Sequence, residues 1–313
     1  MSSQAILVTS STSTSVTSSS SSSVTSSSAA SRQQLIDDAL FLIFSKYLSM
    51  EDLGSATDVC VEWRGILKAH WKSLDLTDLQ ALFPKCTSNF SPEWWVKNRE
   101  NLNLARHGLT VPSASRRPKY SMILEMIRFS ALRVEGNAGF SRVTLPPEMT
   151  LNKLIAIARA PGSRNPIGFY HINPRILKKF GNVPAREFGK GPVGEHCEFL
   201  ITNSVLEKSR NLSAKDQQAL VAGMGYKMTG FLKTVALVVL MYKSSPEGKP
   251  PTYLYNTNPR PKPYRATYAR NSDKIDQHLF LGGLSPAGLY ADISPPWLLG
   301  VKDELGVGGQ QDL

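Results

Sequence analysis

Hydrophobic positions begin abruptly after a long polar leader. Serine and threonine dominate residues 2–31, and such a segment cannot bury enough apolar surface to offset its ordering entropy. We therefore expect a disordered Ser/Thr-rich tail over residues 1–32. From Asp37 onward, apolar residues follow the i, i+3, i+4, i+7 spacing of one helix face. The members of this stripe are Leu40, Ile43, Phe44 and Tyr47.

Two further short helices are predicted before residue 77. Residues 49–52, "SMED", fit the capping pattern that opens a helix, and Gly54 weakens that helix by about 1 kcal/mol relative to alanine. A third helix carries Val59, Trp63 and Ile66 at helical spacing. Three short helices bury a low fraction of their surface, so some of their apolar side chains must face something else. Periodicity alone leaves two possibilities open, a partner protein or the rest of this chain.

Residues 33–77 resemble an F-box. A leading leucine is followed by the run L-x2-I-F-x3-L, then S-x2-D-L, and D-L-x5-V-C-x2-W stands in register behind it. Trp71 occupies the late tryptophan position of the family. The chain departs from the family at Ile36, where an F-box usually has proline.

The resemblance implies docking on the Skp-type adaptor of a Skp–cullin–F-box ubiquitin ligase, while the remaining domain captures a protein substrate. Such a receptor breaks no bond and acts by raising the local concentration of substrate beside the ubiquitin-conjugating enzyme. Val59, Cys60 and Trp63 fit the internal core of the three-helix unit equally well. The resemblance assigns adaptor contact to Leu35, Ile36, Leu40, Phe44, Leu48, Leu53, Val59, Cys60 and Trp63.

Helical and strand-like patterns interleave in the rest of the chain. The fold class expected is therefore α+β: a three-helix F-box followed by a mixed helix/strand domain over residues 119–313. Residues 78–118 are expected to form a connecting segment, because residues 110–121 are polar and contain Pro and Arg. The predicted helices cover residues 120–136, 150–160, 213–225 and 230–244, and the predicted strand and turn segments cover residues 140–149, 197–206, 263–270 and 278–294.

Four phrases of this domain resemble the C-terminal module that follows the F-box in proteins of amoeba-dwelling, chlamydia-like bacteria. They are "VEGNAGFSRVTLPPEMTLNKL", "LITNSVLEKSRNLSAKDQQALVA", "GYKMTGFLKTVALVVLMY" and "LFLGGLSPAGLYADI". That module has no assigned chemistry to carry over. Those relatives carry a different aromatic phrase where this chain has "KPYRATYAR", so the local surface is expected to differ.

No catalytic constellation is evident, and we expect a protein that is not an enzyme and uses no cofactor or metal. His196 adjoins Cys197, but neighbours in a strand point to opposite faces. His171 or His278 could serve Cys197 as a base, yet a small core residue is the favoured interpretation of this cysteine. The three cysteines have no metal-site spacing, and the glycines of residues 189–196 do not form a phosphate loop.

The net charge of +11 favours acidic partners, which include nucleic acid, anionic membranes and acidic proteins. One basic group comprises Arg159, Arg164, Arg175, Lys178, Lys179, Arg186 and Lys190, and a solvated face is its favoured interpretation. A second group interleaves cations with tyrosines, which suits single-stranded nucleic acid or an acidic peptide. Because Tyr and Arg are enriched in binding hot spots, we predict substrate contact there, with a plain loop as the alternative. The predicted substrate-binding residues are Tyr253, Tyr255, Arg260, Tyr264, Arg265, Tyr268 and Arg270.

Partners and location follow from these features. The longest apolar run, residues 235–242, is far shorter than the roughly 20 residues of a membrane span, and the leader lacks the basic and apolar regions of a secretory signal. A eukaryotic-type docking motif on a bacterial-looking module is useful only in a host cell. We therefore expect a bacterial effector with a type III-like export leader, acting in the host cytoplasm.

Its expected partners are a Skp-type adaptor, cullin through that adaptor, and an unknown protein substrate. The less favoured alternative is a basic nucleic-acid-binding protein whose F-box-like helices are only core.

Overall fold

The computed structural model describes residue 65 and residues 83–112, 120–160, 169–185, 197–245, 268–275, 277–285, 288–293 and 305–313. The chain divides into two compact units, Met1–Leu48 and Ser49–Leu313, and every described residue lies in the second. The predicted tail lies outside the described residues. So does every residue predicted to bind the adaptor, from Leu35 to Trp63.

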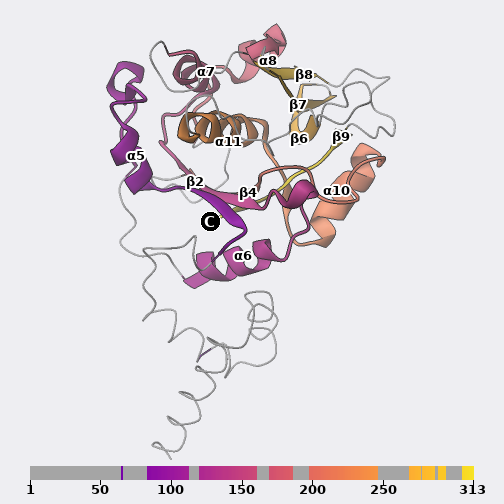
Figure 1. Cartoon of the computed structure of the whole chain (residues 1–313). Coiled ribbons are helices and arrows are strands. Elements are labelled where there is room, and N and C mark those ends of the chain that lie inside the picture. The colour runs from indigo at the N-terminus through magenta and orange to yellow at the C-terminus, as the bar shows by residue number, and fades with distance from the viewer. Residues whose placement is uncertain are drawn as a thin grey trace, which may run out of the picture. The chain divides into compact units, whose positions relative to one another are not determined.

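The first sheet has five strands in the order β1-β2-β4-β10-β5 (Figure 1). β1 runs parallel to β2, whereas the other neighbouring strands are antiparallel. The last strand along the chain therefore lies between two strands that precede it by many residues. The bounds are β1 Cys86–Phe90, β2 Phe140–Leu145, β4 Cys197–Thr202, β5 Lys227–Met228 and β10 Gly309–Asp312.

Residues 83–112, which the sequence assigned to a connecting segment, contribute to this sheet and its core. β1 pairs with β2, and helix α5 (Pro92–Asn98) holds the fully buried Trp95, whose Nε1 donates to the Thr144 carbonyl at 2.5 Å. Ser91 caps α5 by accepting a hydrogen bond from the Trp94 amide at 3.4 Å. A 3-10 helix, η2 (Leu104–His107), follows. The described part of the predicted connector is thus part of the folded module.

The second sheet also has five strands, in the order β3-β8-β7-β6-β9. β7 and β8 are antiparallel and pair as far as Ser285 and Gly288, which confirms the strand and turn segment predicted over residues 278–294. β3 pairs with β8 in parallel, and so does β9 with β6. The bounds are β3 Phe169–Ile172, β6 Tyr268–Ile275, β7 Gln277–Ser285, β8 Gly288–Ile293 and β9 Leu305–Gly306.

Helix α11 (Phe231–Ser244) lies at the centre of the core (Figure 1). Twelve of its 14 residues are buried, because the helix is apolar on nearly every side and must be enclosed. It contacts helix α7 (Leu151–Arg159), strand β4 of the first sheet, and strands β6 and β7 of the second. The buried helix predicted over residues 230–244 is confirmed.

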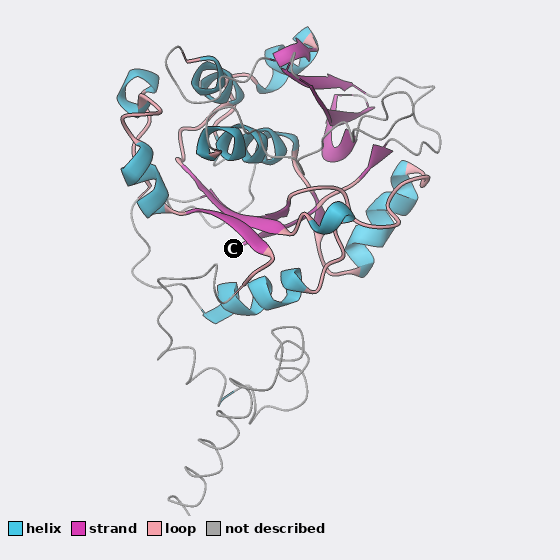
Figure 2. Cartoon of the chain, in the orientation of Figure 1, coloured by secondary structure: helices cyan, strands magenta, loops and turns pink. Residues whose placement is uncertain are grey.

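The remaining helices cover the outside of these layers (Figure 2). Helix α6 (Tyr120–Ser130) lies on the opposite face of the first sheet from α11, and its Phe129 ring packs edge-on to Phe140 at 5.5 Å. α6 ends at Ser130, before the predicted residue 136, and the chain is extended at Val134, which forms a β-bridge with Leu206. Helices α10 (Ala214–Gly223) and α7 confirm the helices predicted over residues 213–225 and 150–160, and they are capped by Ser213 and Thr150.

The described part of the chain is therefore a mixed α+β fold with six α-helices and two mixed sheets. None of the helices in the described ranges has the length and apolar character that a bilayer crossing requires.

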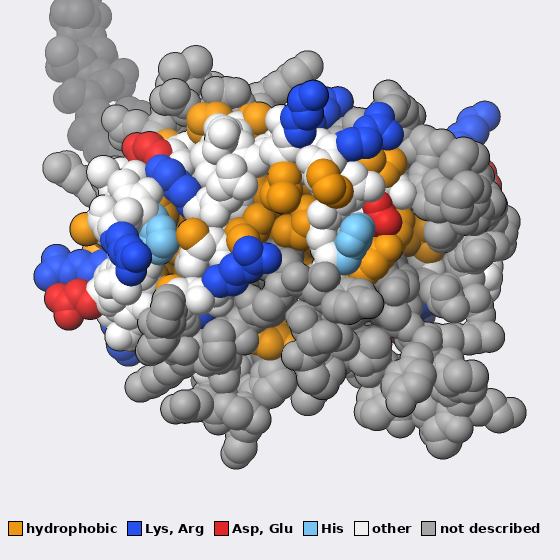
Figure 3. All heavy atoms as spheres, turned by 90° about the horizontal axis from the view of Figure 1, so that it is seen from above, with side chains coloured by type: hydrophobic (Ala, Val, Ile, Leu, Met, Phe, Trp, Pro, Cys, Tyr) orange, Lys and Arg blue, Asp and Glu red, His pale blue; other side chains and the backbone are white. Residues whose placement is uncertain are grey.

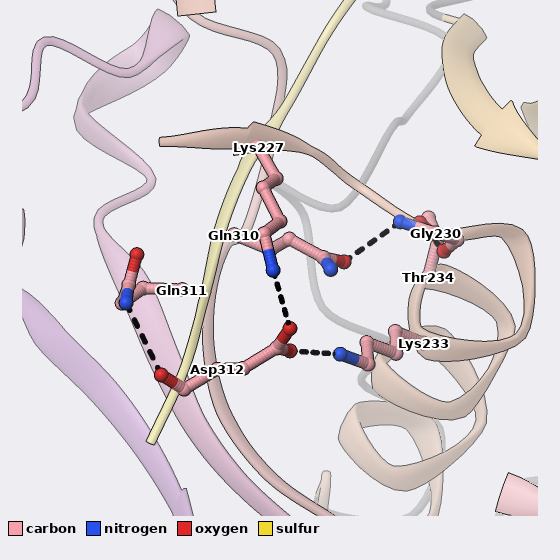
Figure 4. Close-up of polar contacts among 7 residues, drawn as sticks. All are labelled: Lys227, Gly230, Lys233, Thr234, Gln310, Gln311 and Asp312. Atoms are coloured by element: carbon pink, nitrogen blue, oxygen red, sulfur yellow. Dashed lines mark hydrogen bonds and ion pairs between the residues drawn. The ribbon is translucent and has the colours of Figure 1, made fainter. Parts of the chain in front are cut away.

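Strand β10 is tied to α11 by polar contacts on the inner face of the sheet (Figure 4). Asp312 pairs through Oδ1 with Nζ of Lys233 and through Oδ2 with Nζ of Lys227, the latter at 3.1 Å. Gln310 Oε1 accepts a hydrogen bond from the Gly230 amide at 2.7 Å and so satisfies a free N–H at the start of α11. The Lys233 side chain is only 3% exposed, and its Nζ lies 4.7 Å above the Phe199 ring.

The buried ammonium of Lys233 needs a counter-charge, because an ion removed from water is costly unless it is paired. Asp312 supplies that charge. Burial alone would raise the pKa of the Asp312 carboxyl, but Lys233 and Lys227 outweigh burial and hold this pKa below the ordinary value of 3.8.

We predict that Asp312→Asn lowers the free energy of unfolding by about 3 kcal/mol, since it leaves Lys233 buried without its counter-charge. This is the low end of the range for breaking a buried pair, because 31% of the Asp312 side chain reaches solvent. Lys233→Met should cost less, because it removes the buried charge and leaves the more accessible partner. Urea unfolding at neutral pH measures both, and equal stability of Asp312→Asn and wild type would contradict the prediction.

The same pair predicts a pH dependence. A carboxyl whose pKa is lower in the folded state stabilises the fold above its unfolded pKa, and this contribution disappears as the pH falls through the folded pKa. Stability from Asp312 should therefore be complete above about pH 5 and lost progressively below the ordinary pKa of 3.8. The stability difference between wild type and Asp312→Asn should shrink over that acidic range.

Candidate functional site

Most residues predicted to bind substrate lie outside the described part of the chain. These are Tyr253, Tyr255, Arg260, Tyr264 and Arg265. Tyr268 is the first residue of β6, and Arg270 follows within the same strand.

Arg270 lies inside the module, at 1% exposure. Its Nη1 donates to Oε1 of Gln217 at 2.7 Å, and Gln217 is itself fully buried and donates to the Ser209 and Leu305 carbonyls. Burial lowers the pKa of the Arg270 guanidinium. The prediction that Arg270 contacts substrate is therefore corrected: this side chain is buried and joins β6 to α10 through Gln217.

The cysteine and histidines considered for catalysis lie on different sheets. Cys197 is in β4 of the first sheet, whereas His171 is in β3 and His278 in β7 of the second. Cys197 pairs with Leu145, and the two histidines pair with Tyr290 and Lys274. Within the described ranges, no group of three His, Cys, Asp or Glu side chains could hold a metal ion.

Helix α8 (Pro174–Phe180) has most of its residues on the surface. Only Ile176 is buried, and Leu177 is 36% exposed. The helix carries three exposed cations, Arg175, Lys178 and Lys179, and no acidic residue. A helix of seven residues is not stable in isolation, so it must be held at its ends.

The N-terminal end of α8 is held by Asn173. Its Oδ1 accepts a hydrogen bond from the Arg175 amide at 3.0 Å, and its Nδ2 donates to Oδ1 of Asp292 at 2.7 Å. The Asn173 amide also donates to the Ala291 carbonyl at 3.1 Å. Pro174 at the first helical position has its φ preset for a helix. One residue thus caps the helix and fastens it to strand β8.

Asp292 is held in turn by its neighbours on the second sheet. Its oxygens accept hydrogen bonds from the Tyr290 hydroxyl and the Ile293 amide, both at 2.8 Å, and Nε2 of His171 lies 3.7 Å from Oδ2. The rings of His171 and Tyr290 stack at 5.0 Å, and Phe280 stacks with Tyr290 at 5.9 Å. The His171 side chain is 40% exposed, so a fixed imidazole lies on the surface beside α8.

The C-terminal end of α8 is held by α7. The Asn152 amide donates to the Gly181 carbonyl at 3.0 Å, and Nδ2 of Asn152 donates to Oδ1 of Asn182 at 2.8 Å. A Cβ at position 181 would lie 2.4 Å from the Leu177 carbonyl oxygen, so only glycine fits this approach. Both ends of the short helix are therefore fixed to the module.

Figure 3 views the module from the side of α7 and α8 and shows Lys and Arg side chains around an apolar area, with a His beside an acidic side chain. Half-buried apolar residues on these elements include Ile155 of α7 and Phe180 of α8. We define the α8 face as the exposed side chains of Arg175, Leu177, Lys178 and Lys179 together with His171. It combines positive charge with apolar area.

The sequence identified the cations of the α8 face but not the contacts that hold them. The Asn-Pro pair at residues 173–174 was the available signal, since it combines a helix cap with a helix-opening proline. The roles of Asp292 and Tyr290 depend on strand pairing with β3, which local patterns do not reveal.

We predict that Arg270→Ala lowers the free energy of unfolding by about 3 kcal/mol, because it leaves a cavity and an unsatisfied Gln217. Thermal and urea unfolding measure this effect, with the exposed Arg106→Ala as the control. Loss of a binding activity in Arg270→Ala without any loss of stability would instead restore Arg270 as a contact residue.

Comparison of the chain with protein-family models, curated proteins and solved structures finds no match. Its function is therefore inferred from its own residues.

Proposed function

We propose that this chain is an F-box substrate receptor of a host Skp–cullin–F-box ubiquitin ligase. The observation that carries the proposal is the register of Asp52-Leu53, Val59-Cys60 and Trp63 behind a matching first helix. The organisation of the chain supports it, since a folded α+β module with its own core begins by residue 83, shortly after the F-box-like segment.

In this proposal the chain acts by proximity rather than by covalent chemistry. The F-box-like helices bind the adaptor through their apolar side chains, among them Leu40 and Leu53, and the module holds the substrate. Residues 253–268 keep their predicted role in substrate contact, because their tyrosines and arginines are typical of hot spots. Whether the bound protein is ubiquitinated depends on the lysines it presents to the conjugating enzyme.

We predict that the full chain co-purifies with a Skp-type adaptor after co-expression, and that Leu40→Asp with Leu53→Asp abolishes the complex. Charged residues at an apolar interface would be buried without partners, which is strongly unfavourable. Size-exclusion chromatography measures the complex. Val96→Asp is the matched control, because Val96 is 54% exposed on α5 of the module and should not affect adaptor binding. A complex that survives the double substitution would contradict the proposal.

A basic nucleic-acid-binding protein is the competing function, supported by the net charge of +11 and by the exposed cations of α8. It predicts oligonucleotide binding that weakens steeply with salt, because phosphate contacts release counterions. Such binding without any adaptor complex would favour this alternative over the receptor.

We also infer that residues 1–32 form an export leader of a bacterial effector that works in the host cytoplasm. The serine and threonine composition and the eukaryotic-type docking motif support this inference. A reporter fused to residues 1–32 should be exported by a type III apparatus. Continued export of the full chain after deletion of those residues would show that the signal lies elsewhere.

A further inference from the structure

The contact between η2 and helix α7 contains a half-buried histidine. η2 contacts α7, and its Leu104 is buried in the main core. Nζ of Lys153 on α7 donates to the Gly108 carbonyl at 3.0 Å, and Gly108 ends η2 with a left-handed φ of 57°. We propose that His107 makes this contact sensitive to pH, so that mild acidity releases residues 104–109 from α7.

The position of the ring nitrogen Nε2 of His107 supports this proposal. The nitrogen is buried, and it has no hydrogen-bond partner in the part of the chain that the structure describes. A neutral imidazole can carry its hydrogen on Nδ1 and leave Nε2 without one, whereas the protonated ring has an N–H at both positions. Protonation therefore creates a buried donor for which the described residues offer no acceptor, and this costs free energy.

The charged groups that act on His107 within the described structure are both cations. They are the exposed Arg106 of η2 and Lys153 of α7. A protonated imidazole would be a third positive charge beside them, and like charges repel. Burial, Arg106 and Lys153, in that order of effect, hold the pKa of His107 below its ordinary value of 6.5.

The carboxylates on the adjoining segments do not offset these cations. Glu148, just before α7, accepts a hydrogen bond from the Thr110 hydroxyl at 3.1 Å, and Glu100, before η2, pairs with Arg99 at 3.6 Å. Neither carboxylate is among the groups that shift the pKa of His107. The surroundings of this ring therefore favour its neutral form.

The direction of the pH dependence follows from the lowered pKa. When the contact opens, His107 regains access to water and its ordinary pKa of 6.5. Above that pH the ring is neutral in both forms, and the contact is fully favoured. As the pH falls below 6.5, the open form binds a proton more readily, so the contact weakens progressively until the pH has passed the pKa of the closed form. This behaviour does not rest on the proposed receptor function.

The test uses the full chain and follows amide hydrogen exchange by mass spectrometry in peptides that cover residues 104–112, at pH values of about 7.5 and about 5.5. After correction for the intrinsic exchange rates, wild type should lose protection about threefold or more at the lower pH. His107→Gln should show no such loss, because glutamine stays neutral. Arg106→Glu should show a smaller loss than wild type, because it replaces an exposed cation by a carboxylate that favours the protonated ring.

His171→Gln is the matched control, since His171 is a 40% exposed histidine of the second sheet, and it should keep the wild-type loss. An NMR titration of the His107 ring, identified by the resonance that disappears in His107→Gln, should give a midpoint below 6.5. Circular dichroism shows that each variant is folded. Four results would overturn the proposal: no loss of protection in wild type, an equal loss in His107→Gln, an unchanged loss in Arg106→Glu, or a midpoint at or above 6.5.

Discussion

Enclosure of helix α11 is the constraint on which the rest of the module depends. A helix that is apolar on nearly every side has no face for water, so β4 must cover one side and β6, β7 and α7 the others. This requirement brings two sheets and an outer helix around one segment of 14 residues. Lys233 places a positive charge inside that core, and the ion pair with Asp312 offsets the desolvation cost of this charge. The position of strand β10 between β4 and β5 follows from the same requirement, because Asp312 and Gln310 both reach the first turn of α11.

Local patterns predicted the elements with strong periodicity or caps. The helices predicted over residues 150–160, 213–225 and 230–244 and the strand and turn segment predicted over residues 278–294 each depend on neighbouring residues, and each is present. Strand β1 was not predicted, because "CTSNF" is apolar only at its two ends and gains its place by pairing with β2. Residues 78–118 were expected to be a connector because of the polar Pro- and Arg-containing stretch at residues 110–121, whereas residues 83–112 carry β1 and α5 of the module.

The candidate site also combines features that neighbouring residues determine with features that depend on distant parts of the chain. Its cations were visible in the sequence, because charge is a property of single residues. Their fixed presentation was not, because it depends on Asn173 meeting Asp292 across 119 residues of chain and on Gly181 meeting Asn152. Arg270 shows the reverse error. Its neighbours suggested a surface, whereas the side chain is buried against Gln217 of helix α10. Tertiary pairing thus decides which charged residues of this chain reach a partner.

Strand β10 lies between β4 and β5, and this position has a consequence for the order in which the chain can fold. A chain is synthesised from its N-terminus, so β1, β2 and β4 exist long before residues 309–312 are made. Until then one edge of β4 has no strand beside it, and an unpaired edge is a template for aggregation. Closing this sheet requires contacts between distant parts of the chain, which makes folding slow. The first sheet is therefore completed only after residues 309–312 are made, later than each of the other four strands in that sheet, so the β4 edge that β10 covers is the last part of this sheet to be paired.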